Sequence, residues 1–509
     1  MDHLATPAPT ADLETTSSIL EPGLFGTTAA ERFTRLKANL APELGPKPDE
    51  AALAKLVARF AAQEIRLPEL IQGYADLTDV RRWPIVVVRP SGDRQKTEDR
   101  LLALGFPLVP SLVSAYRALD LIPLRIPPEP QVILQFARRP DIQRIERAWL
   151  RGAAPPRGPA EPSDDLIFPD RLLSRDGLPE ELFGQRDPVR VGLLDSGLDA
   201  RHPALQTRLL DQRAFQRNDD RVGDRFGHGT ACAGVMLKLC PSVAFYSAKA
   251  LDRQGSARLD DVLRALGWLK RQQPDLIVVN FLFHQGCDGR AILAHVVEDL
   301  VKSGIPVIVP AVAQGDQLYP PACAKHAISV AAAEDGQAGS ATLRARGKGL
   351  RVPRSIQADA AHFPEQQPTG WTSLRGSAVA AAVAAGTAAL LMRQARLQGR
   401  ELSPEVLKAW LVRGCDERRV LDPRRALDLA LQEETAPMHA DVLYTPTLDD
   451  MTAPMEGGAG LGKLPFFDPE ATEAMRAEDF APTGRQTRKL YEASLQESDA
   501  DLTGRERKK

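Results

Sequence analysis

The stretch VRVGLLDSGLDARHP, residues 189–203, decides the fold. Its apolar run ends at Asp195, and Ser196 and Gly197 follow directly. A strand that is buried on both faces of a parallel sheet has such a continuous apolar run, and ligands bind at the carboxyl ends of these strands. Asp195 is therefore a candidate site residue at the end of a buried strand.

Four more strand-like runs follow this one, and helical stretches separate them. The strand-like runs are VAFYSAKAL at 243–251, DLIVVNF at 275–281, IPVIVPA at 305–311 and HAISVAAA at 326–333, and the helical stretches are HGTACAGVMLKL at 228–239, DDVLRALGWLKR at 260–271 and ILAHVVEDLVKS at 292–303. Buried strands that alternate with amphipathic helices predict an α/β fold, in which helices cover both faces of a parallel sheet. We assign residues 189–432 to this domain.

Two further motifs carry chemistry. His228 lies between glycines in FGHGTACAG, at the start of a helical stretch, and Gly376 and Ser377 open a long helix of small residues. Either motif alone is weak, because short patterns of this kind occur by chance. Their order along the chain, an aspartate, a histidine and then a Gly-Ser helix start, is the order of the catalytic triad in subtilisin.

On these motifs the chain resembles the subtilisin-like serine proteases, the subtilases or peptidase S8 family. Residues 245–281 and 303–332 are also similar to the family's strands and loops, so the resemblance covers about half of the chain. It implies a subtilisin-like fold and endopeptidase chemistry. A serine at position 378 would attack the scissile carbonyl, His228 would accept its proton, and Asp195 would fix the histidine tautomer and stabilise the imidazolium.

The sequence departs from the family at the nucleophile. The family motif is Gly-Thr-Ser-hydrophobic-Ala, and Gly376 together with Gly386 fixes its register here as Gly-Ser-Ala-Val-Ala. Ala378 therefore stands at the nucleophile position, and it has no oxygen that can attack a carbonyl. Ser377 is displaced by one residue, which is about 100° around a helix, so we expect it to point away from His228.

The oxyanion loop and the substrate cleft depart as well. Where the family has an asparagine whose amide stabilises the oxyanion, this chain has Ala313, followed by Gln314. Loss of that donor in subtilisin costs about two to three orders of magnitude in turnover. Two of the cleft positions carry a histidine and a valine in place of glycine, so we expect the first specificity pocket to be narrowed or filled. The residues that match the family's substrate cleft are Leu282, Phe283, His284, Ala311 and Val312.

The N-terminal part has a different pattern. Residues 83–150 alternate as strand, helix, two strands, helix and strand, which predicts a ferredoxin-like α+β plait. Subtilase prodomains have this fold and precede the protease domain, so the resemblance implies a prodomain-like module that packs, uncleaved, on the main domain. Its expected elements are a strand at 84–88, a helix at 96–104, strands within 114–126, a helix at 130–138 and a strand at 142–149. We predict a disordered arm at 1–47, helices within 48–82, a linker at 151–188 and a mostly disordered tail at 433–509.

Composition and charge argue against several other classes. Lys and Arg total 65 and Asp and Glu total 67, so nothing favours nucleic acid or an anionic membrane as partner. The polar N-terminus lacks a secretory signal pattern, and we interpret the apolar runs as core rather than membrane spans. The five cysteines have no metal-ligand spacing, and we predict reduced thiols in a cytoplasmic protein with no metal or other cofactor. We expect Asp219, Asp220 and Asp224 to lie in a solvated loop.

Three functions remain open at this point. In the first, the chain is a pseudoprotease whose cleft binds a peptide or protein partner without turnover. In the second, it is an active subtilisin-like endopeptidase whose serine was replaced by Ala378 through engineering, and in the third it is a scaffold with an idle cleft. The changes in the oxyanion loop and cleft are not ones an experimenter would choose, and they favour the pseudoprotease. In every case Asp195, His228 and Ala378 should converge at the carboxyl edge of the sheet.

Overall fold

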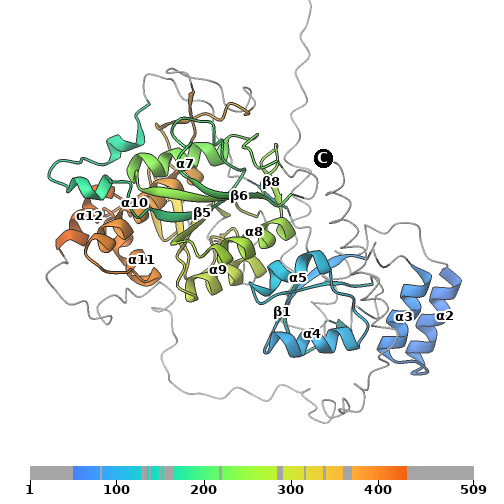
Figure 1. Cartoon of the computed structure of the whole chain (residues 1–509). Coiled ribbons are helices and arrows are strands. Elements are labelled where there is room, and N and C mark those ends of the chain that lie inside the picture. Colours follow the sequence, from blue (N-terminus) through green and yellow to red (C-terminus); the bar gives the residue numbers. More distant parts are fainter. Residues whose placement is uncertain are drawn as a thin grey trace, which may run out of the picture.

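The structure, a computed structural model, describes the chain from residue 50 to residue 432, and the arm and tail expected at the two ends lie outside this range. Within it, the described residues form an N-terminal region and a larger α/β domain (Figure 1). The residues left out between 50 and 432 are 79, 81–82, 128–131, 133–134, 137–138, 148–150, 154–165, 217–220, 284–290, 315–316, 336–339 and 359–369.

The core of the larger domain is a seven-stranded sheet in which all neighbouring strands are parallel. Its central strands are buried along their whole length, as their continuous apolar sequences require. β5 lies between β9 and β7 and ends at Asp195. In spatial order the strands are β14 (Leu343–Ala345), β13 (Ile328–Ala332), β10 (Val307–Pro310), β9 (Leu276–Val279), β5 (Val189–Asp195), β7 (Val243–Lys249) and β6 (Leu209–Ala214).

Helices cover both faces of this sheet, which confirms the predicted fold class (Figure 1). Along β9, Leu276 and Val278 pack with one helical layer, and Ile277 and Val279 pack with the other. This alternation is the period of two that a strand imposes on its side chains. The first layer is α7 (His228–Leu239), α10 (Ser377–Leu397), α11 (Pro404–Arg413) and α12 (Pro423–Gln432), and the second is α8 (Leu259–Gln272) and α9 (Ile292–Lys302).

α10 is built mostly from alanine, valine and leucine. By length and composition alone this helix could cross a membrane. Its apolar stretch is entirely buried inside the protein, however, as in a core helix. Its small residues allow close packing, because a Cβ added at Gly386 would come within 3.0 Å of the Leu239 side chain in α7. This burial agrees with the interpretation of the alanine-rich run as core.

The N-terminal region contains a three-stranded antiparallel sheet in the order β2-β1-β3, and an isolated bridge joins Leu108 to Leu124 of β2. A helical hairpin precedes it within the expected helical segment. The elements are α2 (Glu50–Ala61), α3 (Leu67–Leu77), β1 (Ile85–Pro90), α4 (Arg94–Ala103), α5 (Pro110–Arg117), β2 (Ile122–Arg125) and β3 (Ile142–Arg147).

The expected strand from residue 114 is wrong at its start, because α5 occupies Ser114 to Arg117. Pro110 opens this helix, and Leu112 and Tyr116, one turn apart, are both buried. Of the expected helix at 130–138, the described residues Val132, Gln135 and Phe136 are helical, and the remaining ones lie outside the described residues.

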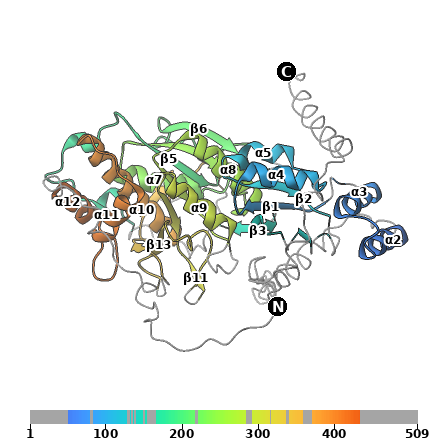
Figure 2. The ribbon, with the colours of Figure 1, turned by 90° about the horizontal axis from the view of Figure 1, so that it is seen from below.

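The N-terminal region packs on the α8–α9 face of the larger domain (Figures 1 and 2). α5 lies so close to α8 that a Cβ added at Gly267 would meet the carbonyl oxygen of Ala115 at 2.3 Å. Arg89 of β1 forms an ion pair with Asp299 of α9 through hydrogen bonds of 2.6 and 3.1 Å. Ile85 and the α8–α9 side chains belong to one apolar cluster, so the two regions share part of their core.

Residues 151–188, expected to be a linker, make specific contacts with the larger domain. β4 (Arg151–Ala153) pairs antiparallel with β8 (Ser256–Arg258), and Ile167 forms a bridge with Leu350. Two 3-10 helices follow, η5 (Pro169–Leu172) and η6 (Glu180–Phe183). The linker prediction is wrong for these parts, because backbone pairing depends on the partner strand and leaves no mark on the composition of the segment.

Candidate active site

Asp195 ends β5 at the carboxyl edge of the sheet and is fully buried. Its Oδ1 accepts a hydrogen bond from the backbone N–H of Ser196 at 2.6 Å, and its Oδ2 accepts one from the side-chain amide of Asn280 at 3.1 Å. Asn280 directly follows β9, the neighbouring strand. A buried carboxylate requires such donors, and here they also fix the plane of the group.

His228, the first residue of α7, contacts this carboxylate. Its Nδ1 lies 2.9 Å from both Oδ1 and Oδ2 of Asp195, and the ring is buried. Because an ionised carboxylate only accepts hydrogen bonds, this contact assigns the proton of a neutral ring to Nδ1. Nε2 is then the free acceptor, which is the state a general base needs.

Two glycines permit this approach. Gly197, which directly follows Asp195 and Ser196, has a φ of 102°. A Cβ on this residue would lie 2.5 Å from the carbonyl oxygen of Val222. A Cβ at Gly229 would lie 2.2 Å from the carbonyl oxygen of Gly197. A side chain at Gly229 would push α7 away from β5 and separate His228 from Asp195, whereas one at Gly197 would displace the loop at Val222.

Asp224 supports the histidine motif and is the main residue that the sequence interpretation missed. It is fully buried, so the expectation of a solvated loop is wrong for it; Asp219 and Asp220 lie outside the described residues. Its carboxylate accepts hydrogen bonds from the backbone N–H groups of Gly227 at 2.6 Å and Thr230 at 2.8 Å. Burial raises the pKa of Asp224, and these hydrogen bonds oppose the shift.

Ser196 links the two carboxylates. Its hydroxyl donates to Asp224 Oδ1 at 2.8 Å and accepts from the backbone N–H of Gly229 at 3.0 Å, while its own N–H donates to Asp195. The start of α7 is therefore held by one network that includes both aspartates. The sequence contains a weak signal for this network. Asp224 stands four residues before His228, and an acidic residue close to a helix start is favourable there.

α10, which carries Ala378, runs parallel to α7. α7 ends just before β7 begins, so its C-terminal end lies at the amino edge of the sheet. The C-terminal end of α10 lies at the same edge, since Arg393 donates to the carbonyl of Asp187 and Arg396 to that of Pro188, just before β5. Both helices therefore begin at the carboxyl edge, where Asp195 lies.

The two helices pack closely along their middle parts. A Cβ at Gly386 would lie 3.0 Å from the Leu239 side chain and 3.1 Å from the Cα of Met236. The start of α10, with Ala378, therefore lies at the same edge of the sheet as His228.

Ala378 is buried at the second position of α10, after Gly376 with φ of 114°. The hydroxyl of the preceding Ser377 is buried and makes no hydrogen bond to His228 or to any other described residue. A serine nucleophile must lie within hydrogen-bond reach of its base. Ser377 does not meet this condition, as its displacement by one helical position predicts.

The oxyanion position lies in a small hairpin. Ala313 and Gln314 form β11, which pairs antiparallel with β12 (Gln317–Leu318). Ala313 is half-buried and offers only its backbone N–H and a methyl group. The side chain of Gln314 lies outside the described residues, so its role stays a prediction.

The remaining predicted cleft residues pack mainly inward. Leu282, Phe283 and Ala311 are buried, and only Val312 is half-exposed. The backbone N–H of Phe283 donates to the carbonyl of Pro320 at 2.8 Å, which joins two walls of this region. His284 lies outside the described residues, so the prediction that it plugs the pocket is not tested. The short strand β8 pairs antiparallel with β4.

One group of described residues has the donor atoms for a metal. Asp195, His228 and Cys232, one turn further along α7, offer ligand atoms within 4.8 Å of one another, and all three residues are buried. The Asp195 oxygens already accept hydrogen bonds from Ser196, Asn280 and His228. An ion would therefore have to replace the Asp–His hydrogen bond, so the donor set fits an acid–base pair better than a metal site.

The cysteines are not all reduced thiols. Three buried cysteines, Cys232, Cys240 and Cys415, are outside any disulfide. Burial raises the pKa of Cys415 to about 11, which makes that thiol inert. Cys323, which follows β12 closely, is disulfide-bonded, so the prediction of reduced thiols is wrong for this residue. Spacing along the chain does not show which cysteines meet in space.

A parallel sheet with an Asp–His pair at its carboxyl edge is the arrangement of a subtilisin-like fold, here with alanine at position 378. Residues 186–426, a little under half of the chain, match the subtilase family (peptidase S8). Subtilisin DY of Bacillus licheniformis is 27% identical over 218 residues, which cover 40% of this chain and 76% of that protein.

Two further comparisons extend this result. The intracellular serine protease of Paenibacillus polymyxa is 29% identical over 163 residues, which cover 28% of this chain and about half, 49%, of that protein. Among solved structures, fervidolysin of Fervidobacterium pennivorans, described as a keratinolytic enzyme related to subtilisin, superposes with a TM-score of 0.53 at 16% identity. That alignment covers 70% of this chain and 62% of fervidolysin, and it supports the fold alone.

Proposed function

We propose that this protein is a subtilase pseudoprotease, which binds an extended peptide or protein segment in the cleft and does not cleave it. The observation that supports the proposal is Ala378 at the start of α10, a helix that begins at the same edge of the sheet as the intact Asp195–His228 pair. Without an oxygen at this position no acyl-enzyme can form, whatever the histidine does. Ala313 removes a side-chain donor from the oxyanion site as a second, independent loss.

The binding mode follows from β8. This short strand pairs antiparallel with β4, in the register Arg151 to Arg258 and Ala153 to Ser256. β-strand addition recognises a peptide through its backbone and is independent of catalysis. β8 therefore supplies the peptide-binding edge, and in this structure the chain's own segment after the N-terminal region occupies it. A partner peptide would compete with β4 for this edge.

We infer that the N-terminal region acts as a prodomain-like module that stays attached. The segment directly after it forms β4. The region itself shares an apolar cluster with α8 and α9 through Ile85, and the Arg89–Asp299 ion pair adds a polar contact. A chain without a nucleophile cannot cut the segment between the two regions. We propose a cytoplasmic location, and the similarity to an intracellular serine protease supports it. The disulfide at Cys323 argues the other way, because disulfides are more typical of oxidising compartments.

The second candidate is an active endopeptidase inactivated by a serine-to-alanine change. The observation that favours it is the completeness of the network around Asp195 and His228, which includes Asn280, Ser196 and Asp224. In that case a serine at 378 would attack the carbonyl, and His228 would pass its proton to the leaving amine.

Restoration of the serine tests the proposal. The chain itself should not react with a fluorophosphonate probe or hydrolyse peptides, and Ala378→Ser should add little, because the oxyanion donor is still missing. Adding Ala313→Asn and His284→Gly should be required before turnover appears, with about a 10²–10³-fold gain from the asparagine alone. Ala378→Gly is the matched control, since it changes the same position without an oxygen. Robust cleavage by the single Ala378→Ser variant would overturn the pseudoprotease in favour of the inactivated protease.

A further inference from the structure

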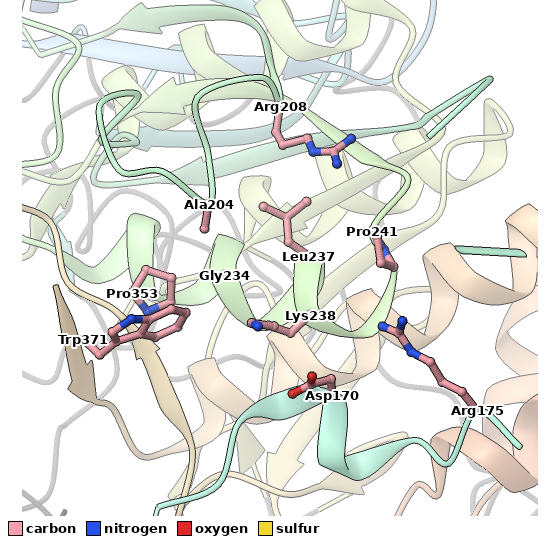
Figure 3. A pocket seen from close by; sticks show the side chains of 10 residues that line it. All are labelled: Asp170, Arg175, Ala204, Arg208, Gly234, Leu237, Lys238, Pro241, Pro353 and Trp371. Atoms are coloured by element: carbon pink, nitrogen blue, oxygen red, sulfur yellow. The ribbon is translucent and has the colours of Figure 1, made fainter. Parts of the chain in front are cut away.

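A pocket of about 350 Å³ lies beside the C-terminal half of α7, whereas His228 is the first residue of that helix. Leu237 and Lys238 of α7 form its middle (Figure 3). Arg208 lies on one side, and Asp170 and Arg175 lie on the opposite side, near η5. The pocket thus lies between three segments, and none of the residues that line it belongs to the Asp195–His228 network.

The charges in this pocket are unbalanced. Arg175, Arg208 and Lys238 face a single carboxylate, Asp170, and none of the three cations forms an ion pair with another described residue. Lys238 Nζ lies 5.6 Å from the centre of the Trp371 ring, which also lines the pocket. Three cations around one carboxylate leave a net positive charge that attracts an anion, and the aromatic side chain adds an apolar surface.

Asp170 adds a second requirement. Its Oδ1 is buried and has no hydrogen-bond partner among the described residues. A buried carboxylate oxygen without a donor is unfavourable, so an occupant should bring an N–H group as well as negative charge. An acidic peptide has both, because its side chains can pair with Arg208 and Lys238 while a backbone N–H donates to Asp170.

The chain itself carries such a segment. Between residues 433 and 484 it has eleven acidic residues and two basic ones, with Tyr444, Phe466 and Phe467 among them. α12, the last described helix, is attached to the pocket wall, since Arg424 donates to the carbonyls of Ser174 at 3.1 Å and Asp176 at 2.7 Å. These two residues flank the pocket residue at position 175.

The distance is within reach of the following segment. α12 is about 15 Å long at 1.5 Å per residue, and an extended chain spans about 3.3 Å per residue. The acidic pair Asp449–Asp450 therefore reaches the pocket from Gln432 with chain to spare. We propose that an acidic part of residues 433–484 docks in this pocket, with carboxylates on Arg208 and Lys238 and a backbone N–H on Asp170.

Zero-length cross-linking with a carbodiimide tests this docking in the full chain. The reagent joins an amine to a carboxylate only when the two form a direct ion pair, and Lys238 is the amine of the pocket. We expect mass spectrometry to find Lys238 joined to an Asp or Glu of residues 433–484 within one chain. A mixture of isotope-labelled and unlabelled protein distinguishes this from a link between two chains. Lys238→Arg keeps the charge but removes the amine, so it should abolish the link, whereas Lys302→Arg on α9 should leave it unchanged.

Charge reversal gives a second readout. Arg208→Glu should lower the yield of the Lys238 link by about fivefold, as loss of one ion pair implies, without a change in the melting temperature of the main domain. A link from Lys238 to Asp170 alone, a link only between different chains, or no link to residues 433–484 would each overturn the proposal.

Discussion

The contact between the two regions predicts a measurable effect of one methyl group. Gly267 lies in the middle of α8, and a Cβ there would stand 2.3 Å from the carbonyl oxygen of Ala115 in α5. Ordinary contacts of this kind are about 3.4 Å or longer, so α5 must retreat by about 1 Å in Gly267→Ala. Overpacking of this size costs about 1–3 kcal/mol. The substitution also stabilises α8 by up to about 1 kcal/mol through helix propensity, so global stability alone is an ambiguous measure.

Hydrogen exchange resolves the two effects, because it reports each element separately. In Gly267→Ala the amides of α5 and β1 should exchange faster by about fivefold to hundredfold, which corresponds to 1–3 kcal/mol of local opening, while α8 keeps its protection. Gly92→Ala is the matched control, since a Cβ at Gly92 meets nothing within 4 Å. If α5 exchanged alike in both variants, the close approach of α5 to α8 would not hold the regions together.

Two further predictions concern charged groups of α8, α9 and β1. Burial and the neighbouring Asp260 raise the pKa of Asp261 from 3.8 to about 6, so the folded state holds this proton more tightly than the unfolded state. The contribution of Asp261 to stability should therefore be largest below about pH 4, and about 3 kcal/mol of it should be lost as the pH rises from 4 through 6. Asp261→Asn should flatten this part of the pH profile of urea unfolding, and an unchanged slope would contradict the assignment. A double-mutant cycle with Arg89→Ala and Asp299→Ala should give a coupling free energy of about 1 kcal/mol in unfolding, because the ion pair is bidentate and half-buried. Additive effects of the two substitutions on the free energy of unfolding would show that the ion pair contributes nothing.

The sequence predicted the subtilase domain well for a physical reason. Buried parallel strands need continuous apolar runs, and the residue that ends such a run lies at the carboxyl edge of the sheet. The position of Asp195 at this edge could therefore be predicted from the apolar run that precedes it. His228 and Ala378 open helices that return from the same edge, so the order of the motifs was enough to expect all three at one site.

The sequence was less informative where contacts depend on partners far along the chain. The second half of α5, from Ser114, was expected to be a strand, because a short apolar pattern is compatible with either structure. Burial of Leu112 and Tyr116 on one side of the helix selects the helix. β4 was assigned to a linker, because its pairing with β8 uses backbone groups.

What the sequence by itself determined is the fold class, the positions of the Asp–His pair and the absence of a serine at position 378, since each depends on residue type and local order. Only the tertiary structure decided that Asp224 is buried beneath the histidine motif, that Cys323 is in a disulfide, and that a cationic pocket forms beside α7. These features bring together segments that are distant along the chain. Their burial and charge are set by the neighbours they meet after folding, and a linear pattern does not contain that information.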